Sequence, residues 1–116
     1  MVTGADHSTP TISTHVLDTE RGAPAQGVHV TLYRLDVGAG GPIRMTQALT
    51  DSDGRIRDLL ERPLVAGDYR IEFDVAHEDA SFFTKVAVDL RITDAQRTYH
   101  VPLLLAPYSM TTYRGS

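Results

Sequence analysis

Short segments in which apolar and polar residues alternate are the feature that most restricts how this chain can fold. A period of two places every second side chain on the same face of a β-strand, whereas an amphipathic helix repeats about every 3.6 residues. Turn-forming residues separate these segments at intervals typical of a β-sandwich, and helical periodicity is scarce. The pattern predicts an all-β protein whose strands form two sheets.

Eight strands are predicted, each bounded by turn-forming residues. They cover Ile12–Leu17, Val28–Tyr33, Met45–Leu49, Arg55–Ile56, Asp68–Phe73, Lys85–Ile92, Tyr99–Leu105 and Tyr108–Tyr113. Pro102 lies inside the seventh of these strands. Because proline has no backbone N–H to donate to a neighbouring strand, we expect the ladder to be irregular at this residue.

The length of the chain sets its domain organisation. Its 116 residues form one domain, which we place at residues 12–116, and residues 1–11 are expected to form a flexible lead-in. This lead-in has neither a basic start nor an apolar segment, so it is not predicted to be a secretory signal. The chain has no cysteine, which excludes disulfides and thiolate metal sites, and a cytoplasmic location is expected.

Charge and hydropathy argue against two classes of partner. The net charge is −4, and the 11 Lys and Arg residues are scattered rather than clustered, so nucleic acid is not an expected partner. No apolar run approaches the roughly 20 residues that a membrane-spanning helix needs. We therefore predict a soluble protein that binds neither nucleic acid nor membranes.

Two histidines are predicted to lie on the outward faces of their strands. Alternation places His100 opposite the core residues Tyr99 and Val101. In the first strand it places His15 on the same outward face as Ser13. A single histidine on a strand is more often structural than catalytic, so these two carry weight only together with other features.

The sequence closes on Tyr113-Arg114-Gly115-Ser116, directly after the last predicted strand. Final residues usually fray and tolerate change, but these bring a guanidinium, hydroxyl groups and a carboxylate together. The ending is therefore either part of a site or a frayed tail whose last two residues come from cloning.

Four blocks of the sequence, in this order, resemble the 5-hydroxyisourate hydrolases, the transthyretin-like enzymes of urate degradation. The blocks are Thr14–Thr19 with Gly22–Ala25, the Asp53-Gly54-Arg55 turn, Tyr99–Leu105 with Pro107-Tyr108, and Tyr113–Ser116. The resemblance runs from about Ile12 to the last residue. It implies an eight-stranded transthyretin-like sandwich that assembles as a homotetramer, with its sites in a channel between dimers.

The resemblance also implies a reaction and a site. The family opens a ring amide of 5-hydroxyisourate to give 2-oxo-4-hydroxy-4-carboxy-5-ureidoimidazoline, without a cofactor. The positions that match its catalytic motifs are His15, Arg55, His100 and Ser116. The expected substrate-binding residues are Arg55, Tyr113, Arg114, Gly115 and Ser116.

Hormone-carrying transthyretins share this fold, so a carrier that binds a small planar ligand without turning it over is the alternative. The carriers have lysine, glutamate and threonine where this chain has His15, Arg55 and His100, which favours the enzyme. The chain departs from the hydrolases at Val75–Ser81, where family members have a longer segment with a short helix. We expect that helix to be reduced or absent.

The residue types at these positions suit hydrolysis of a strained, anionic heterocyclic amide. An imidazole with a pKa of about 6.5 can accept a proton from water at neutral pH, which makes His15 or His100 the expected general base. The guanidinium of Arg55 or Arg114 can stabilise the oxygen that becomes anionic. Ser116 is expected to position substrate or water, because attack by water needs no covalent intermediate.

The five histidines do not predict a metal site. None is spaced i, i+2 or i, i+4 from another, as local zinc motifs require. His29 is expected to be a partly exposed structural residue, and His7 and His77 are expected to lie in loops. A calcium loop that started at Asp51 would need glycine at its sixth and glutamate at its twelfth position, where this chain has Ile56 and Arg62.

Overall fold

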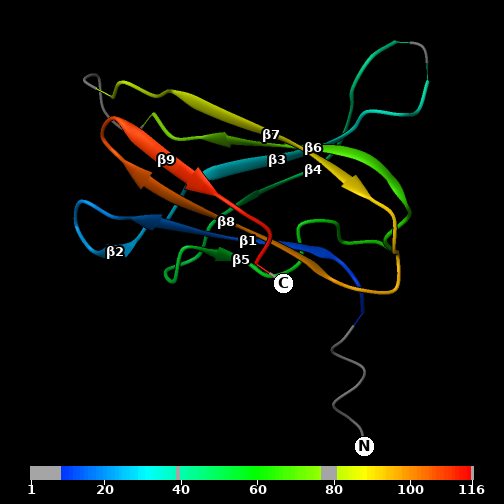
Figure 1. Ribbon diagram of the computed structural model, residues 1–116, viewed down its shortest axis with the longest axis horizontal. Helices are drawn as coiled ribbons and strands as arrows, with labels where there is room; N and C mark the ends of the chain where they lie inside the picture. Colours follow the sequence, from blue (N-terminus) through cyan, green and yellow to red (C-terminus); the bar gives the residue numbers. More distant parts are fainter. Residues whose placement is uncertain (1–8, 39, 77–80, 116) are drawn as a thin grey trace, which may run out of the picture.

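The protein is a sandwich of two β-sheets, as seen in a computed structural model that describes residues 9–38, 40–76 and 81–115 (Figure 1). These described residues contain no helix, and the predicted all-β, two-sheet fold is confirmed. The first sheet contains β1 (Ile12–Asp18), β2 (Ala23–Pro24), β5 (Arg55–Ile56), β8 (Tyr99–Ala106) and β9 (Ser109–Thr112). The second contains β3 (His29–Arg34), β4 (Ile43–Leu49), β6 (Gly67–Asp74) and β7 (Lys85–Ile92).

Strand order brings β1, the first strand of the chain, beside β8, one of the last two, in the first sheet. Its order is β2-β1-β8-β9, and β5 also pairs with β1, while the second sheet has the order β4-β3-β6-β7. The pairing of β1 with β8 is parallel and runs from Ile12 beside Tyr99 to Asp18 beside Leu105. This pairing places the two strands that carry the predicted outward histidines side by side.

The core fills the space between the two sheets. Tyr69, Ile71 and Phe73 of β6 are at most 1% exposed, and Ile12 and Val16 of β1 belong to the same buried cluster. Burying a side chain of this size contributes roughly 1.5–3 kcal/mol to folding. Because Ile12, Thr14 and Val16 of β1 point inward, the residues that alternate with them are presented on the outer face of the first sheet.

All eight predicted strands are present, with ends that differ by at most two residues from the prediction. The structure adds β2, whose two residues pair with Leu17 and Asp18 of β1. The sequence does not reveal β2, because Ala23 and Pro24 follow Gly22 and are typical of a turn between strands. The described residues contain no helix long and apolar enough to cross a membrane.

The irregularity expected at Pro102 is absent, and that expectation was wrong. The β1–β8 ladder runs through the pair His15–Pro102 without a shift in register. The β9 ladder begins only at the next residue, with Leu103 beside Thr112, and the carbonyl of Pro102 accepts a hydrogen bond from Thr112 Oγ1 at 2.8 Å. The N–H and C=O of one residue point to the same side of a strand, so the missing N–H lies on the β9 side, just beyond that ladder.

Several sequence-based expectations fall outside the described residues. They concern His7, His77, Ser116 and most of the segment Val75–Ser81, so the reduced helix stays a prediction. At the end of the predicted lead-in, Thr11 is buried. Its hydroxyl donates to Asp58 Oδ1 at 2.5 Å, which ties the entry of β1 to the loop after β5.

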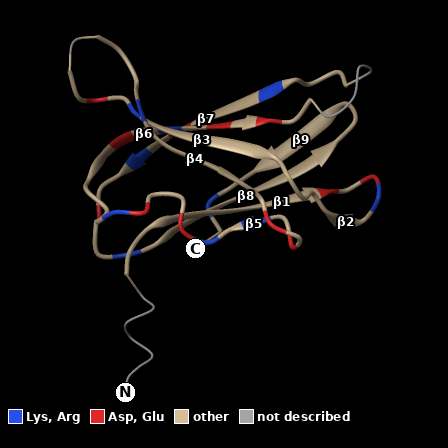
Figure 2. Cartoon of the chain, turned by 180° about the vertical axis from the view of Figure 1, so that it is seen from behind, with Lys and Arg blue, Asp and Glu red and all other residues tan. Residues whose placement is uncertain are grey.

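Charged residues of both signs are spread over the strands and loops (Figure 2). Several form pairs across neighbouring strands of the second sheet. Arg70 Nε lies 2.7 Å from Asp89 Oδ1, and Arg91 Nε lies 3.1 Å from Asp68 Oδ1. These exposed pairs each contribute little to stability, but they neutralise charge along β6 and β7.

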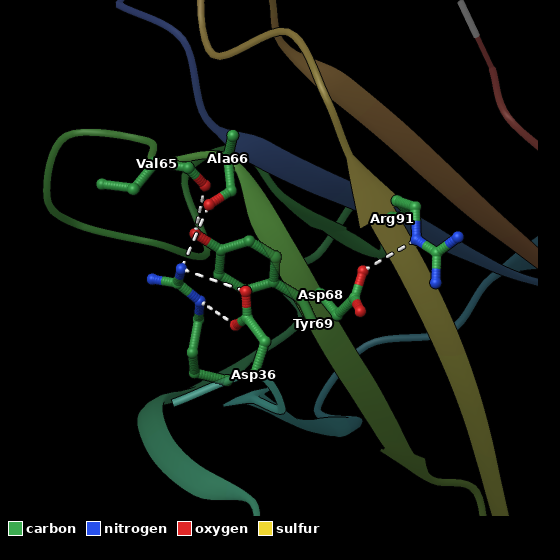
Figure 3. Close-up of polar contacts among 7 residues, drawn as sticks. Asp36, Val65, Ala66, Asp68, Tyr69 and Arg91 are labelled. Carbon is green, nitrogen blue, oxygen red and sulfur yellow. Dashed lines mark hydrogen bonds and ion pairs between the residues drawn. The ribbon is translucent and has the colours of Figure 1, made fainter. Parts of the chain in front are cut away.

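A polar cluster holds the start of β6 (Figure 3). The Arg34 guanidinium donates to Asp36 Oδ1 at 2.6 Å and to the carbonyl of Ala66 at 3.1 Å, and it lies over the Tyr69 ring. The Tyr69 hydroxyl donates to the carbonyl of Val65 at 2.6 Å. Its residues belong to the second sheet and the adjoining loops, so the cluster stabilises the scaffold and leaves the outer face of the first sheet free.

Candidate functional site

His15 lies on the outer face of β1, as predicted. Its neighbours Thr14 and Val16 are buried in the core, whereas His15 and Ser13 are partly exposed. This alternation follows directly from the strand conformation of Ile12–Asp18. The imidazole is therefore presented on the surface of the first sheet, with β5 on one side of β1 and β8 on the other.

A tight turn before β5 places Arg55 beside His15. Asp51 Oδ1 accepts hydrogen bonds from the backbone N–H of Asp53 at 2.8 Å and of Arg55 at 3.0 Å. Gly54 has a φ of 75°, and its carbonyl accepts from the N–H of β1 residue Val16 at 2.7 Å. A Cβ at Gly54 would lie 2.4 Å from the Val16 carbonyl oxygen, so the turn requires glycine.

The register of β5 completes the placement of Arg55. Its Cα is paired with that of His15 in the antiparallel β1–β5 ladder, and Ile56 is paired with Thr14. Directly paired residues share a face, so Arg55 lies on the outer face with His15, while Ile56 and Thr14 are buried.

His100, on β8, is the third member of this group. It is paired with Ser13 in the β1–β8 ladder, and its Nδ1 lies 2.8 Å from Ser13 Oγ. The pKa of His100 is lowered from 6.5, first because burial disfavours the charged ring and then because Arg55 and His15 lie nearby. The imidazole is therefore neutral at pH 7.

The C-terminal segment folds back onto His100. The backbone N–H of Gly115 donates to the His100 carbonyl at 2.7 Å. A Cβ at Gly115 would lie only 2.7 Å from His100 Cδ2, so only glycine fits against the ring without a shift. The segment after β9 is thus held against the outer face of β8.

Tyr113 and Arg114 lie apart from this group. The Arg114 guanidinium carbon lies 5.0 Å from the centre of the Tyr99 ring, a cation–π distance. With Tyr113, which is 53% exposed, it lines a cavity of about 290 Å³ bounded by β7 and β8. Within one chain, the structure brings together His15, Arg55, His100 and Gly115, and it places Arg114 elsewhere.

His29 is separated from the group by its position in the other sheet. It is the first residue of β3 and is exposed. Among the described residues, no three His, Cys, Asp or Glu side chains gather closely enough to hold a metal ion.

Sequence reasoning did not assign a role to Ser13. Alternation shows that Ser13 shares a face with His15, but the contact with His100 depends on the parallel pairing of strands 87 residues apart. That pairing has no signal in local periodicity.

The arrangement can support proton transfer and stabilise negative charge. A neutral imidazole held by a hydroxyl can accept a proton through its free ring nitrogen. The nearby guanidinium of Arg55 can stabilise an oxygen that becomes anionic. Both groups lie on an outward-facing sheet surface that a small polar molecule can reach.

The sequence of this chain is similar to a known protein family and to several of its members. The family model described as transthyretin, HIUase/transthyretin family, matches residues 12–115. The chain is 42% identical over 117 residues to the 5-hydroxyisourate hydrolase of Deinococcus radiodurans. That alignment includes 92% of this chain and 97% of the Deinococcus protein. It is 44% identical over 124 residues to the uric acid degradation bifunctional protein TTL of Arabidopsis thaliana. That alignment includes 94% of this chain but only 38% of the plant protein.

Solved structures give the same placement. The 5-hydroxyisourate hydrolase of Klebsiella pneumoniae is similar with a TM-score of 0.79 and 36% identity, over 92% of this chain and 99% of that chain. Sea bream transthyretin in complex with thyroxine is similar with a TM-score of 0.80 and 29% identity, over 89% of this chain and 92% of the transthyretin chain. The chain belongs to the HIUase/transthyretin family.

Proposed function

We propose that this protein hydrolyses 5-hydroxyisourate to 2-oxo-4-hydroxy-4-carboxy-5-ureidoimidazoline by attack of water on a ring amide. The observation that carries the proposal is the group formed by His15, Arg55 and His100 on the outer face of the first sheet. Relatives and solved structures named 5-hydroxyisourate hydrolase, alike over most of their length, support the same substrate.

His100 is the general base in this proposal. Its lowered pKa keeps the imidazole neutral at pH 7, and its Nδ1 already has a partner in Ser13 Oγ. Nε2 is then the ring nitrogen that takes a proton from the attacking water. A positioned base of this kind contributes about a hundredfold or more to the rate.

Arg55 stabilises the charge that develops on the ring carbonyl oxygen. Its guanidinium carries donors in a fixed fork and cannot lose its proton at neutral pH. His15 lies between Arg55 and the β8 strand, where it orients water or substrate. The reaction needs no cofactor, because water is the nucleophile and the protein supplies both base and cation.

The C-terminal residues bind substrate in this proposal. Gly115 has no Cβ, which lets the C-terminal segment lie directly against the His100 ring. Ser116 then positions substrate or water, while Tyr113 and Arg114 contribute a hydroxyl and a guanidinium to binding. Arg114 lies at the cavity beside Tyr99, apart from His15 and His100 of the same chain. In this proposal it therefore binds substrate only in the assembled protein.

The assembly we propose is a homotetramer with the outer faces of its first sheets turned inward. Leu17 and Leu104 share that face with the histidines and are only partly buried within one chain. A second subunit over this face would cover the leucines and exclude bulk water from the site. The proposed location is the cytoplasm.

A carrier that binds a planar ligand is the second candidate, favoured by the similarity to a transthyretin that is in complex with thyroxine. The two functions separate in one assay. Freshly prepared 5-hydroxyisourate, made by urate oxidase, is mixed with micromolar protein, and its ultraviolet absorbance is followed with and without a chelator. We expect loss several times faster than spontaneous decay, unaffected by the chelator. Decay at the spontaneous rate would refute the hydrolase and leave the carrier.

A further inference from the structure

The ring of His100 is held at two of its edges by groups from other parts of the chain. On one edge, Ser13 Oγ lies 2.8 Å from Nδ1. On the other, Gly115 packs so closely that an added Cβ would lie 2.7 Å from Cδ2. A half-turn of the ring would exchange Nδ1 with Cδ2, which would break the hydrogen bond and present carbon to the Ser13 hydroxyl. The contacts therefore select one ring orientation.

The position of Ser13 is fixed by the backbone pairing of β1 with β8. This residue lies inside β1, and its Cα is paired with that of His100 in the parallel ladder. The hydrogen bond between Ser13 Oγ and His100 Nδ1 thus joins β1 and β8, which pair in a regular ladder. A contact with such a fixed geometry can determine which ring nitrogen carries the proton.

A neutral imidazole carries its proton on only one nitrogen, and a hydroxyl can either accept from Nδ1–H or donate to a bare Nδ1. The Arg55 guanidinium, which lies near the ring from β5, bears on the choice between these arrangements. A guanidinium offers only donors, so a ring nitrogen with a free lone pair is its compatible neighbour. Because Nδ1 is taken by the Ser13 hydroxyl, Nε2 is the nitrogen left for the guanidinium, which favours the tautomer with the proton on Nδ1 and the lone pair on Nε2.

We propose that Ser13 is a positioning residue: its hydroxyl accepts a hydrogen bond from Nδ1–H of His100 and so keeps Nε2 unprotonated for the reaction. The inference rests on the proposed function, in which Nε2 takes the proton from water. Ser13 itself touches neither substrate nor the reacting atoms. It acts by fixing the orientation and the tautomer of the base, as partners of catalytic histidines generally do.

The variant that tests this role is Ser13→Ala, which removes the hydroxyl and keeps the strand. We expect kcat for 5-hydroxyisourate to fall about ten- to hundredfold with KM changed less than twofold, a loss of the size found when the hydrogen-bond partner of a metal-bound histidine is removed. Ser13→Thr keeps a hydroxyl on the same Cβ and should restore most of kcat. The matched control is Thr19→Ala, which removes a hydroxyl that bonds the Leu105 carbonyl at the far end of the same strand pair.

A second readout does not depend on turnover. Long-range ¹H–¹⁵N correlations of the histidine rings, recorded at pH 7.5 on the ¹⁵N-labelled wild-type protein, report which nitrogen of His100 carries the proton. We expect the proton on Nδ1 in the wild type, and a shift toward Nε2–H in Ser13→Ala. A wild-type ring protonated on Nε2, or a Ser13→Ala variant with wild-type kcat, would overturn the proposal. Absence of turnover in the wild type with the Nδ1–H tautomer present would instead refute the proposed function alone.

Discussion

Residues of one type behave differently in this protein according to their surroundings. His29 is exposed at the start of a strand in the second sheet, whereas His100 is partly buried against Ser13 and Gly115. The sequence alternation could predict that His15 and His100 face outward. It could not predict the lowered pKa of His100, because that depends on Arg55 and His15 reaching it from other strands.

The lowered pKa of His100 predicts the pH dependence of the reaction. The base works when neutral, so activity is complete at high pH and is lost as pH falls through its pKa. We expect the acid limb of the kcat/KM profile to have its midpoint below 6.5. Replacing Arg55 by alanine removes a nearby positive charge, so NMR titration should show the pKa of His100 moving up. A profile flat from pH 8 to 5, or an unmoved pKa in Arg55→Ala, would contradict this assignment.

The contact between Gly115 and His100 predicts a steric effect on activity. In Gly115→Ala the added methyl group would lie 2.7 Å from His100 Cδ2, so the ring or the C-terminal segment must move. A displacement near 1 Å costs about a hundredfold in rate. We expect kcat/KM to fall by about that factor with an unchanged melting temperature. Gly40→Ala is the matched control, since nothing lies within 4 Å of a Cβ there, and it should keep wild-type activity.

Strands were the most predictable elements, because their alternation is local. No strand limit differs from its prediction by more than two residues, and β5 (Arg55–Ile56) and β7 (Lys85–Ile92) were predicted with their observed bounds. Two features escaped prediction for physical reasons. The two residues of β2, Ala23 and Pro24, are typical of a turn, and the regular ladder at Pro102 depends on where β9 begins. The parallel β1–β8 pairing, which assembles the site, is a long-range contact that no local pattern encodes.

The turn before β5 is the element that positions Arg55, and it depends on Gly54. Alanine there would need a φ of 75° and would bring its Cβ to 2.4 Å from the Val16 carbonyl oxygen. We expect Gly54→Ala to lower the free energy of unfolding by about 2 kcal/mol and to reduce activity beyond the loss of folded protein. Urea denaturation and turnover per folded molecule measure the two effects. Wild-type turnover at unchanged stability would show that the turn does not position Arg55.

At the scale of the whole molecule, the candidate site lies on an open sheet face rather than in an enclosed pocket. His15, Arg55 and His100 come from three strands of the first sheet and are each partly exposed within one chain. An enzyme that excludes water from this face requires a second subunit over it. Family resemblance carries the expectation of a tetramer, and the partly buried leucines beside the histidines agree with it.

The proposed assembly predicts a mass in solution. Multi-angle light scattering at micromolar concentration should give about 51 kDa, the mass of four chains of 12.7 kDa. Activity should fall if dilution dissociates the assembly. A fully active monomer would mean that one chain contains the complete site.

We propose that the outer face of the first sheet makes this protein a hydrolase, and this is tested most directly by the rate of 5-hydroxyisourate loss with the wild type and two variants. We expect the wild type to accelerate ring opening in proportion to its concentration. His100→Ala should lose at least about a hundredfold, and His29→Ala, in the second sheet, should keep the wild-type rate. Wild-type protein that leaves the spontaneous rate unchanged, or a folded His100→Ala variant as active as His29→Ala, would contradict the account.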